Sequence, residues 1–269
     1  MNSAADTIKM SPFPPPFPPP CTHRQRMPAM QVTRTYIEDI LGTDAWFASL
    51  PPAMQQGMLD IASTKRLSKG QSLFSRGEAT DGVYCLLEGR LSARDGSEHG
   101  DEAVQLHLCP VFWFGEMGLY DKLPRAHHIR AESPALLLWL DNQRLRQLLH
   151  EQPSLWFHFG LLLTQKLRLA LFALDGRTLQ SNELRVARTL LMMAKLYTPG
   201  KQDVRLRLPV AQHEVADMLG MSRQTVNLSL QRLKADGLID MAYNKIEITH
   251  LLALQEKVRF AHWLPVSAQ

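Results

Sequence analysis

The sequence is poor in cysteine and contains no long hydrophobic run. Only three cysteines occur among the 269 residues, at positions 21, 85 and 109, and their wide spacing gives neither a disulfide framework nor the paired thiolates of a zinc site. The longest uninterrupted apolar run, PALLLWL at residues 134–140, is too short to cross a bilayer, and the N-terminus lacks the apolar core of a signal peptide. We therefore expect a cytoplasmic protein that has no membrane partner.

Patterns typical of enzymes are also missing from the sequence. His213 and Glu214 begin like the zinc motif H-E-x-x-H, but no second histidine follows four residues after the first. Paired carboxylates and a nucleophile beside a base are absent too, so the sequence predicts neither an enzyme nor a metal site. The 30 lysines and arginines only slightly outnumber the 26 aspartates and glutamates, which by itself is weak support for a polyanionic partner.

With 45% hydrophobic residues, the chain can form two modest domains that each have a core. Residues 1–34 contain the stretch SPFPPPFPPP, which can donate few backbone hydrogen bonds. This composition predicts a disordered, extended arm, and a docking site for an aromatic-lined module is the alternative.

The spacing of apolar residues along the rest of the chain predicts an α+β protein. Between residues 36 and 63 the spacing is helical and is broken by Pro51 and Pro52. Over residues 67–140, short apolar runs alternate with glycine, aspartate and proline, as in an antiparallel β domain with tight corners. We therefore expect an N-terminal domain over residues 35–153.

Residues 154–181 are expected to contain one long helix, over 154–175. The few polar side chains of this helix separate two apolar stripes, whereas one stripe would suffice to pack it on its own domain. We predict that the helix also packs on its copy in a homodimer, and burial of the whole helix within one domain is the alternative. The first stripe consists of Leu155, Phe159, Leu162, Leu169 and Ala173, and the second of Trp156, Leu163, Leu167, Ala170 and Leu174.

Residues 182–250 show the pattern of a winged helix-turn-helix. We expect a helix in VARTLLMMAKLY that ends at Thr198, a strand in RLRLPV, and two helices in AQHEVADMLG and SRQTVNLSLQRLKADG that are separated by a three-residue turn. LIDMAYNKIEIT then alternates as a β-hairpin does. Residues 251–269 are assigned to a C-terminal tail.

The second helix of the pair has its polar residues at its start, in GMSRQTVNL. Ser222 can cap this helix, and the guanidinium group of Arg223 matches O6 and N7 of guanine. Gln224 can pair with adenine, while Val226 and later apolar residues attach the opposite face to the preceding helix. This arrangement predicts that the start of the helix enters the major groove of DNA.

The glycine-cornered β domain, the stretch FGEMGLYDKLPRAHHIRA, the long apolar helix and GMSRQTVNLSLQRLKADGLI together resemble the family of the cyclic-AMP receptor protein and the fumarate-nitrate regulator, the CRP/FNR family. The resemblance covers residues 36–250. It implies a homodimeric bacterial transcription regulator, with a cyclic-nucleotide-binding-like β-roll, a long dimerisation helix and a C-terminal winged helix-turn-helix. Such a regulator binds a palindromic site on double-stranded DNA and contacts RNA polymerase.

The resemblance also implies an effector pocket in the β-roll. Gly115, Glu116 and Arg125 match the cassette that binds the ribose and the cyclic phosphate. The alternative is that Glu116 and Arg125 belong to an ion pair within the domain that only holds the loop.

The same cassette departs from the pattern of proteins that bind cyclic AMP. Ala126 replaces the serine that contacts the phosphate, His127 fills the following small position, and Ala170 stands where the long helix receives adenine. Loss of the hydroxyl alone costs about 1–2 kcal/mol, so cyclic AMP is not the favoured ligand. Another nucleotide or small molecule stays open as the effector.

Other effectors of the family fit the sequence no better. Iron-sulfur ligation needs a set of N-terminal cysteines, and only Cys21 lies there. Haem needs an axial ligand, for which His107, His127 and His128 are candidates by residue type alone. We therefore predict no cofactor.

The reading helix departs from members that recognise the cyclic-AMP-receptor site. Arg223 is kept, but Gln224 and Leu228 replace a glutamate and a second arginine, so the target should differ in its bases. Ala211 occupies the usual cap position of the first helix of the motif, so Glu214 lacks its capping-box partner. The predicted DNA contacts are Ser222, Arg223, Gln224, Thr225, Asn227, Leu228, Lys234 and Lys245. The alternative function is a nucleotide-binding regulatory module that acts through a protein partner.

Overall fold

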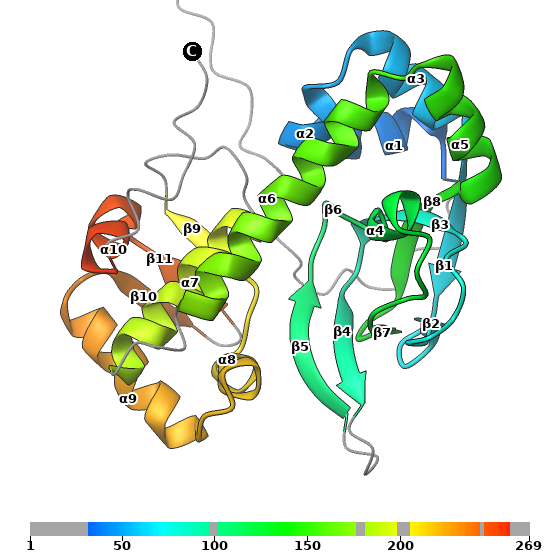
Figure 1. Ribbon diagram of the computed structural model, residues 1–269. Coiled ribbons are helices and arrows are strands. Elements are labelled where there is room, and N and C mark those ends of the chain that lie inside the picture. Colours follow the sequence, from blue (N-terminus) through cyan, green and yellow to red (C-terminus); the bar gives the residue numbers. More distant parts are fainter. Residues whose placement is uncertain (1–31, 97–101, 176–180, 198–204, 243–244, 259–269) are drawn as a thin grey trace, which may run out of the picture.

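A computed structural model describes residues 32–96, 102–175, 181–197, 205–242 and 245–258. The proline-rich arm with Cys21, the expected helix end at Thr198 and the tip of the expected hairpin at residues 243–244 lie outside this part of the chain. Figure 1 shows a β-rich part and a smaller, mainly helical part joined by helix α6, Leu155–Asp175. Within these ranges, no helix combines the length and the apolar character needed to cross a membrane.

Three short helices open the described chain, as the sequence predicts. Helix α1 is Arg34–Leu41, α2 is Ala45–Ala48 and α3 is Pro52–Ile61. The hydroxyl group of Thr33 accepts from the Tyr36 amide and caps α1. Pro52 is the first residue of α3, where its missing N–H would have no partner in the helix. The two prolines therefore separate helices and do not interrupt one.

Within the described residues of the N-terminal part, eight strands form two antiparallel sheets, with orders β1-β8-β3-β6 and β2-β7-β4-β5. The predicted β domain is confirmed, with β1 beginning at Ala62, earlier than expected. A short helix, α4 at Met117–Tyr120, stands between β6 and β7 and was not expected from the sequence. The strands are β1 Ala62–Leu67, β2 Ser72–Phe74, β3 Gly82–Glu88, β4 Leu91–Gly96, β5 Glu102–Leu108, β6 Phe112–Phe114, β7 His128–Ala131 and β8 Ala135–Asp141.

Strand β3 lies between two cores and is apolar on both faces. Val83, Cys85 and Leu87 pack with the N-terminal helices, with α5 at Asn142–Glu151 and with the start of α6. Tyr84 and Leu86 point to the opposite side and pack with residues of the second sheet. The alternation follows from the two-residue period of a strand and ties the helices to both sheets.

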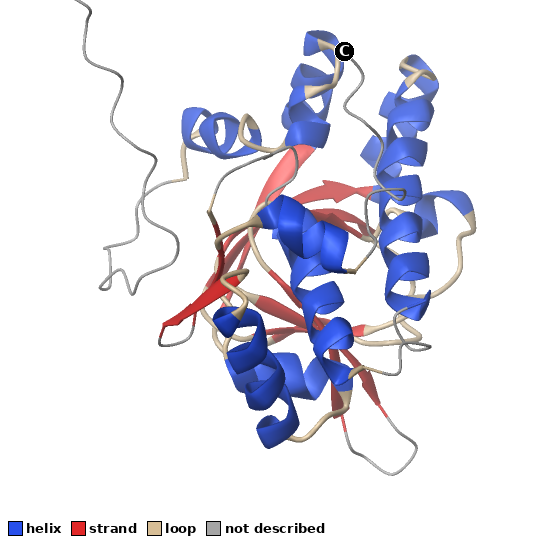
Figure 2. Ribbon diagram, turned by 90° about the vertical axis from the view of Figure 1, so that its left-hand side faces the viewer, coloured by secondary structure: helices blue, strands red, loops and turns tan. Residues whose placement is uncertain are grey.

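The C-terminal part is a winged helix-turn-helix, as predicted. The three-stranded sheet has the order β10-β11-β9, and Figure 2 gives a side view of the chain coloured by helix and strand. The elements are α7 Asn182–Tyr197, β9 Leu206–Leu208, α8 Gln212–Leu219, α9 Arg223–Ala235, β10 Ile239–Ala242 and β11 Lys245–Ile248.

The assignment of residues 251–269 to a tail is wrong in its first part. Residues Leu251–Lys257 form helix α10, which contacts α7 and buries Leu254 completely. The Lys257 ammonium group lies 2.7 Å from carboxylate oxygens of both Glu183 and Asp236. These contacts make α10 part of the domain, because its apolar residues complete the same core as those of α9.

Candidate DNA-reading surface and effector pocket

Helix α9 begins as the sequence predicts. The hydroxyl group of Ser222 accepts a hydrogen bond from the Thr225 amide at 3.1 Å and caps the helix. Gly220 ends the preceding helix α8 in the left-handed conformation, with φ of 60°, which a residue with a Cβ rarely adopts. Three residues, 220–222, therefore turn the chain from α8 into α9.

The two faces of α9 have opposite character. Val226, Leu230 and Leu233 are fully buried in the core of the domain. Arg223 and Gln224, at the start of the helix, are exposed to solvent. The apolar side therefore fixes the helix on its domain and leaves the polar start on the surface.

A groove runs between the starts of α8 and α9 and the two strands of the wing. It brings together five of the predicted DNA contacts from α9 and β11, whereas Ser222 and Thr225 form the cap beside it. Lys234 lies further along α9 and its ammonium group is 2.8 Å from the Asp240 carboxylate. The groove is lined by Val210, Ala211, Gln212, His213, Arg223, Gln224, Asn227, Leu228, Ala242 and Lys245.

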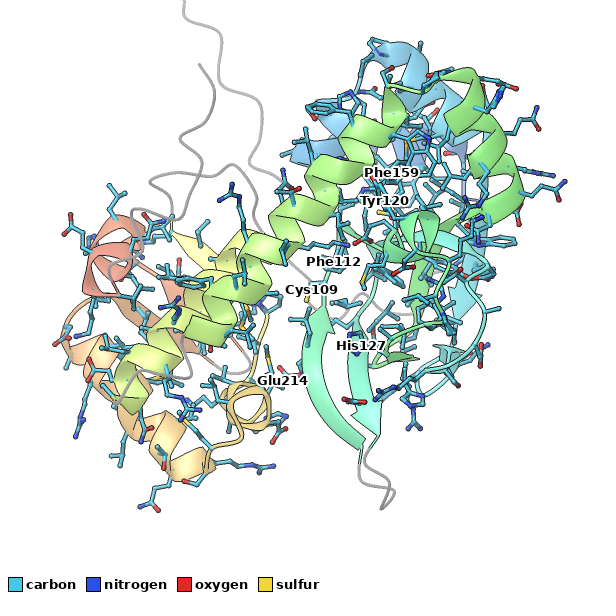
Figure 3. The ribbon with its side chains drawn as sticks, in the orientation of Figure 1. Cys109, Phe112, Tyr120, His127, Phe159 and Glu214 are labelled. Carbon is cyan, nitrogen blue, oxygen red and sulfur yellow. The ribbon has the colours of Figure 1, made fainter. Side chains whose placement is uncertain are left out.

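Helix α8 has half of a capping box. Ala211 provides no side-chain cap, as expected, but the Glu214 carboxylate accepts from the Ala211 amide at 2.7 Å. The other carboxylate oxygen of Glu214 forms an ion pair with Arg90, which precedes β4 in the β-rich part. Figure 3 shows Glu214 on the side of α8 that faces β5.

The Arg90–Glu214 pair was not found from the sequence. The two residues are 124 positions apart, so no local spacing relates them. His107 of β5 lies close by, with its Nε2 3.9 Å from the same Glu214 oxygen, and its side chain is 8% exposed. Burial lowers the pKa of His107, and the Glu214 carboxylate opposes that shift. The arrangement places the imidazole group of His107 at the contact between the two domains.

The effector cassette holds its two charged residues in separate ion pairs. The Glu116 carboxylate, which is 3% exposed, lies 2.8 Å from the ammonium group of Lys166 on α6. The Arg125 guanidinium group lies 2.5 Å from the Asp81 carboxylate and donates to the Gly82 carbonyl at 2.8 Å. Glu116 and Arg125 therefore have different partners, Lys166 and Asp81, and Lys166 belongs to α6 and not to the expected N-terminal domain.

The sequence contained a signal for only one of these partners. Lys166 stands out as one of few cations in an otherwise apolar helix. It also donates to the Trp113 carbonyl at 2.5 Å, which joins α6 to strand β6. Asp81 stands in a loop before β3, where an aspartate is ordinary, so its role could not be read from spacing.

Aromatic rings fill the space beside Arg125. Its guanidinium carbon lies 4.2 Å from the centre of the Phe74 ring, and Phe74 contacts Tyr84 and Phe114. Gly115 has φ of +94°, and a Cβ there would stand 2.6 Å from Arg125 Nη1. The glycine is therefore needed both for its backbone conformation and for the close approach of the arginine.

The remaining effector candidates lie on the surface of the chain. Ala126 and His127 are exposed on the loop after Arg125, and Ala170 is exposed on α6. Of the haem candidates, His128 accepts through Nδ1 from the Arg76 amide at 3.4 Å. Among the described residues, no group of three or more histidine, cysteine, aspartate and glutamate side chains is placed to hold a metal ion.

Two family models match the two parts of the chain. The family described as "Cyclic nucleotide-binding domain" matches residues 64–152, and the "Crp-like helix-turn-helix domain" matches residues 184–257. The second match includes helix α10, in agreement with its packing on α7. The two matches thus cover the β-roll and the DNA-reading domain on either side of α6.

Curated relatives cover most of the chain. This chain is 27% identical over 192 residues to the cAMP-activated global transcriptional regulator CRP of Pasteurella multocida. The alignment spans 71% of this chain and 91% of that protein. It is 23% identical over 226 residues to the CRP-like cAMP-activated global transcriptional regulator of Mycobacterium tuberculosis, over 83% of this chain and 100% of that protein.

Solved structures share the fold. FixK2 from Bradyrhizobium japonicum superposes with a TM-score of 0.61 at 16% identity, over 73% of this chain and 96% of that chain. The c-di-GMP responsive global regulator CLP of Xanthomonas campestris superposes with a TM-score of 0.55 at 21% identity, over 74% of this chain and 99% of that chain. With both domains matched in order and the relatives named as transcription regulators, the chain belongs to the CRP/FNR family of DNA-binding transcription regulators.

Proposed function

We propose that the protein acts in the cytoplasm as a homodimer that binds a palindromic DNA site through α9 and regulates transcription by contacting RNA polymerase. The observation that carries this proposal is the groove, in which Arg223, Gln224 and Asn227 from one face of α9 meet Lys245 of the wing. A capped, exposed helix start offers hydrogen-bonding groups to base edges, and a nearby cation can meet a phosphate.

The homodimer is supported by the exposure of one side of α6. The first predicted stripe is buried in the sensor domain at Leu155 and Phe159, both 0% exposed. On the second stripe, Leu167 and Leu174 are 56% and 52% exposed in the single chain. An apolar stripe of this kind on a helix is typical of a surface that packs on a second copy.

A twofold axis along α6 would give the protein two copies of the DNA-reading surface. Each copy would place α9 in the major groove of one half-site, and the half-sites would be about one helical turn apart. The target would therefore be a palindrome. Its bases would differ from those of the cyclic-AMP-receptor site at the positions that Gln224 and Leu228 contact.

We propose further that cyclic AMP is not the effector. The pairs Glu116–Lys166 and Arg125–Asp81 occupy the two charged groups that the cassette would offer to a nucleotide. A ligand would have to separate both pairs without a serine at Ala126 in return. This chain would then differ in its effector from the relatives named as cAMP-activated.

Selection of DNA from a random pool by the purified protein tests the function directly. The expected result is enrichment of a palindrome with half-sites about one helical turn apart, without added cyclic AMP. Parallel selections with cyclic AMP and with cyclic di-GMP test whether either nucleotide acts as the effector. Failure to enrich any sequence would contradict the proposal and would favour a regulatory module that acts through a protein partner.

A further inference from the structure

Two amide side chains meet across the groove of the DNA-reading domain. Gln212 is the first residue of α8, and Asn227 lies in the second turn of α9. The Asn227 Nδ2 atom donates to Gln212 Oε1 at 2.8 Å, and Gln212 Nε2 donates to the Met241 sulfur on β10 at 3.6 Å. One short chain of hydrogen bonds therefore links both helices of the motif to the wing.

Met241 decides which way the two amides face. A thioether sulfur accepts hydrogen bonds and cannot donate, so the amide nitrogen of Gln212 must face it. The carbonyl oxygen of Gln212 then faces Asn227 and can only accept, so Asn227 must turn its own nitrogen toward α8. Both amides are half-buried, which limits competition from water for these bonds.

The bond to Gln212 leaves Asn227 with a defined set of groups. One N–H is used, and one N–H and the carbonyl oxygen remain. In the major groove, adenine presents an N7 acceptor beside an N6 donor, whereas guanine presents two acceptors. Cytosine presents a donor and thymine an acceptor beside a methyl group. Only adenine offers the donor and acceptor that the remaining groups of Asn227 complement together.

The position of Asn227 suits it for contact with a base. It lies four residues after Arg223 and three after Gln224, so the three side chains share one face of α9. All three line the groove. A base contact by Asn227 would therefore fall beside the guanine expected for Arg223.

We propose that Gln212 is a positioning residue, which holds the Asn227 amide in the orientation that reads adenine. This inference rests on the proposed function, because it assumes that α9 meets DNA. It assigns to α8 a part in base preference that does not require Gln212 to touch the base.

The test compares the wild type, Gln212→Met, Asn227→Ala and the double variant on four duplexes. The duplexes carry the selected palindrome and differ only at the base pair where Asn227→Ala abolishes the preference. Gln212→Met keeps the length of the side chain and removes the amide. We expect the wild type to prefer adenine by roughly tenfold, and Gln212→Met to lose most of that preference. In the double variant, Gln212→Met should not change the base preference further, because Asn227→Ala has already removed the amide that Gln212 holds.

A purely structural role of Gln212 predicts a different result. Loss of folding would lower the thermal unfolding midpoint and would weaken binding to all four duplexes by the same factor. Loss of a direct phosphate contact by Gln212 would likewise weaken binding to all four duplexes by the same factor. Either outcome would overturn the inference. His213→Ala is the matched control, since His213 is the next residue of α8 and lines the same groove. It should leave the order of the four bases unchanged.

The outcomes also separate this inference from the proposed function. If the wild type selects a palindrome and Arg223→Ala relaxes one position, but Asn227→Ala relaxes none, the inference is wrong and the function stands. If the wild type binds the selected palindrome no more tightly than a scrambled duplex, both are wrong.

Discussion

Arg223 is the single residue on which sequence-specific binding should depend most. It is exposed at the first position of α9, where its planar guanidinium group can donate two parallel hydrogen bonds to a guanine. We expect Arg223→Ala to lose about 1–3 kcal/mol of binding free energy per half-site and to relax the preference at one guanine. Fluorescence titrations on the selected duplex and on a scrambled duplex would measure both effects.

Lys245→Ala is the control for charge, because it removes a cation from the same groove. If Lys245 meets only phosphate, both duplexes should lose affinity alike, and the salt dependence should become shallower by about one unit. An equal loss on both duplexes for Arg223→Ala would instead show that α9 does not read bases in this way.

Single residues also mark the limit of prediction from sequence. The Ser222 cap follows from local chemistry, because a hydroxyl group reaches an amide three residues ahead within one turn. The Lys166–Glu116 pair depends instead on how α6 crosses the β-roll, which brings together residues 50 positions apart. The charged groups Glu116 and Arg125 could thus be named from the sequence, but the pairing of each with its partner could not.

At the scale of one element, α6 should control the oligomeric state. Leu167 and Leu171 are 56% and 42% exposed in the single chain, so charges there should spare the fold of the monomer. We expect Leu167→Lys with Leu171→Lys to convert the proposed dimer into a monomer, because like charges from two copies would meet along the helix. Light scattering at micromolar concentration measures the mass. Gln165→Lys, at an exposed polar position of the same helix, should leave the mass unchanged, and a monomeric wild type would contradict the prediction.

Helix α10 should contribute to the stability of the DNA-reading domain. Leu254 is fully buried, whereas Leu252 in the same helix is 56% exposed. Leu254→Ala should lower the free energy of unfolding by about 2–5 kcal/mol because it leaves a cavity. Leu252→Ala should change it by about 0.5 kcal/mol or less. Urea unfolding would measure the difference, and equal effects would mean that α10 does not pack on the domain.

Elements were predicted well where the period of apolar residues was regular. The run from 154 to 175 has a helical period throughout and forms α6 as expected. Helix α10 was missed because its seven residues are too few to show a period, and its stability depends on the core that α7 and α9 provide. Helix α4, with four residues, was missed for the same reason.

At the scale of the whole molecule, the contact between the two domains should depend on pH. Burial lowers the pKa of His107 from its ordinary value of 6.5, although Glu214 and Glu132 raise it, and Arg90 and Arg94 lower it further. The folded protein therefore binds fewer protons than the unfolded chain just below pH 6.5. Its stability should be full above that pH and decrease as the pH falls through the lowered pKa.

Thermal unfolding between pH 7.5 and pH 5.5 would measure this dependence. His107→Gln keeps a polar side chain of similar size and removes the titrating group, so the unfolding midpoint of that variant should fall less on acidification. An equal decrease in both proteins would assign the pH dependence to other groups.

The carboxylate of Glu214 interacts with both domains. One oxygen accepts a hydrogen bond from the backbone at the start of its own helix, and the other forms an ion pair with Arg90. In chimeric regulators, in which a reading domain is grafted onto a foreign sensor domain, Glu214 would be separated from Arg90. A graft of residues 182–258 without a basic residue at the place of Arg90 would leave one Glu214 oxygen facing the foreign surface without a cation. Engineers who exchange the sensors of such proteins should therefore transfer Arg90 together with the reading domain, although it lies in the other half of the chain.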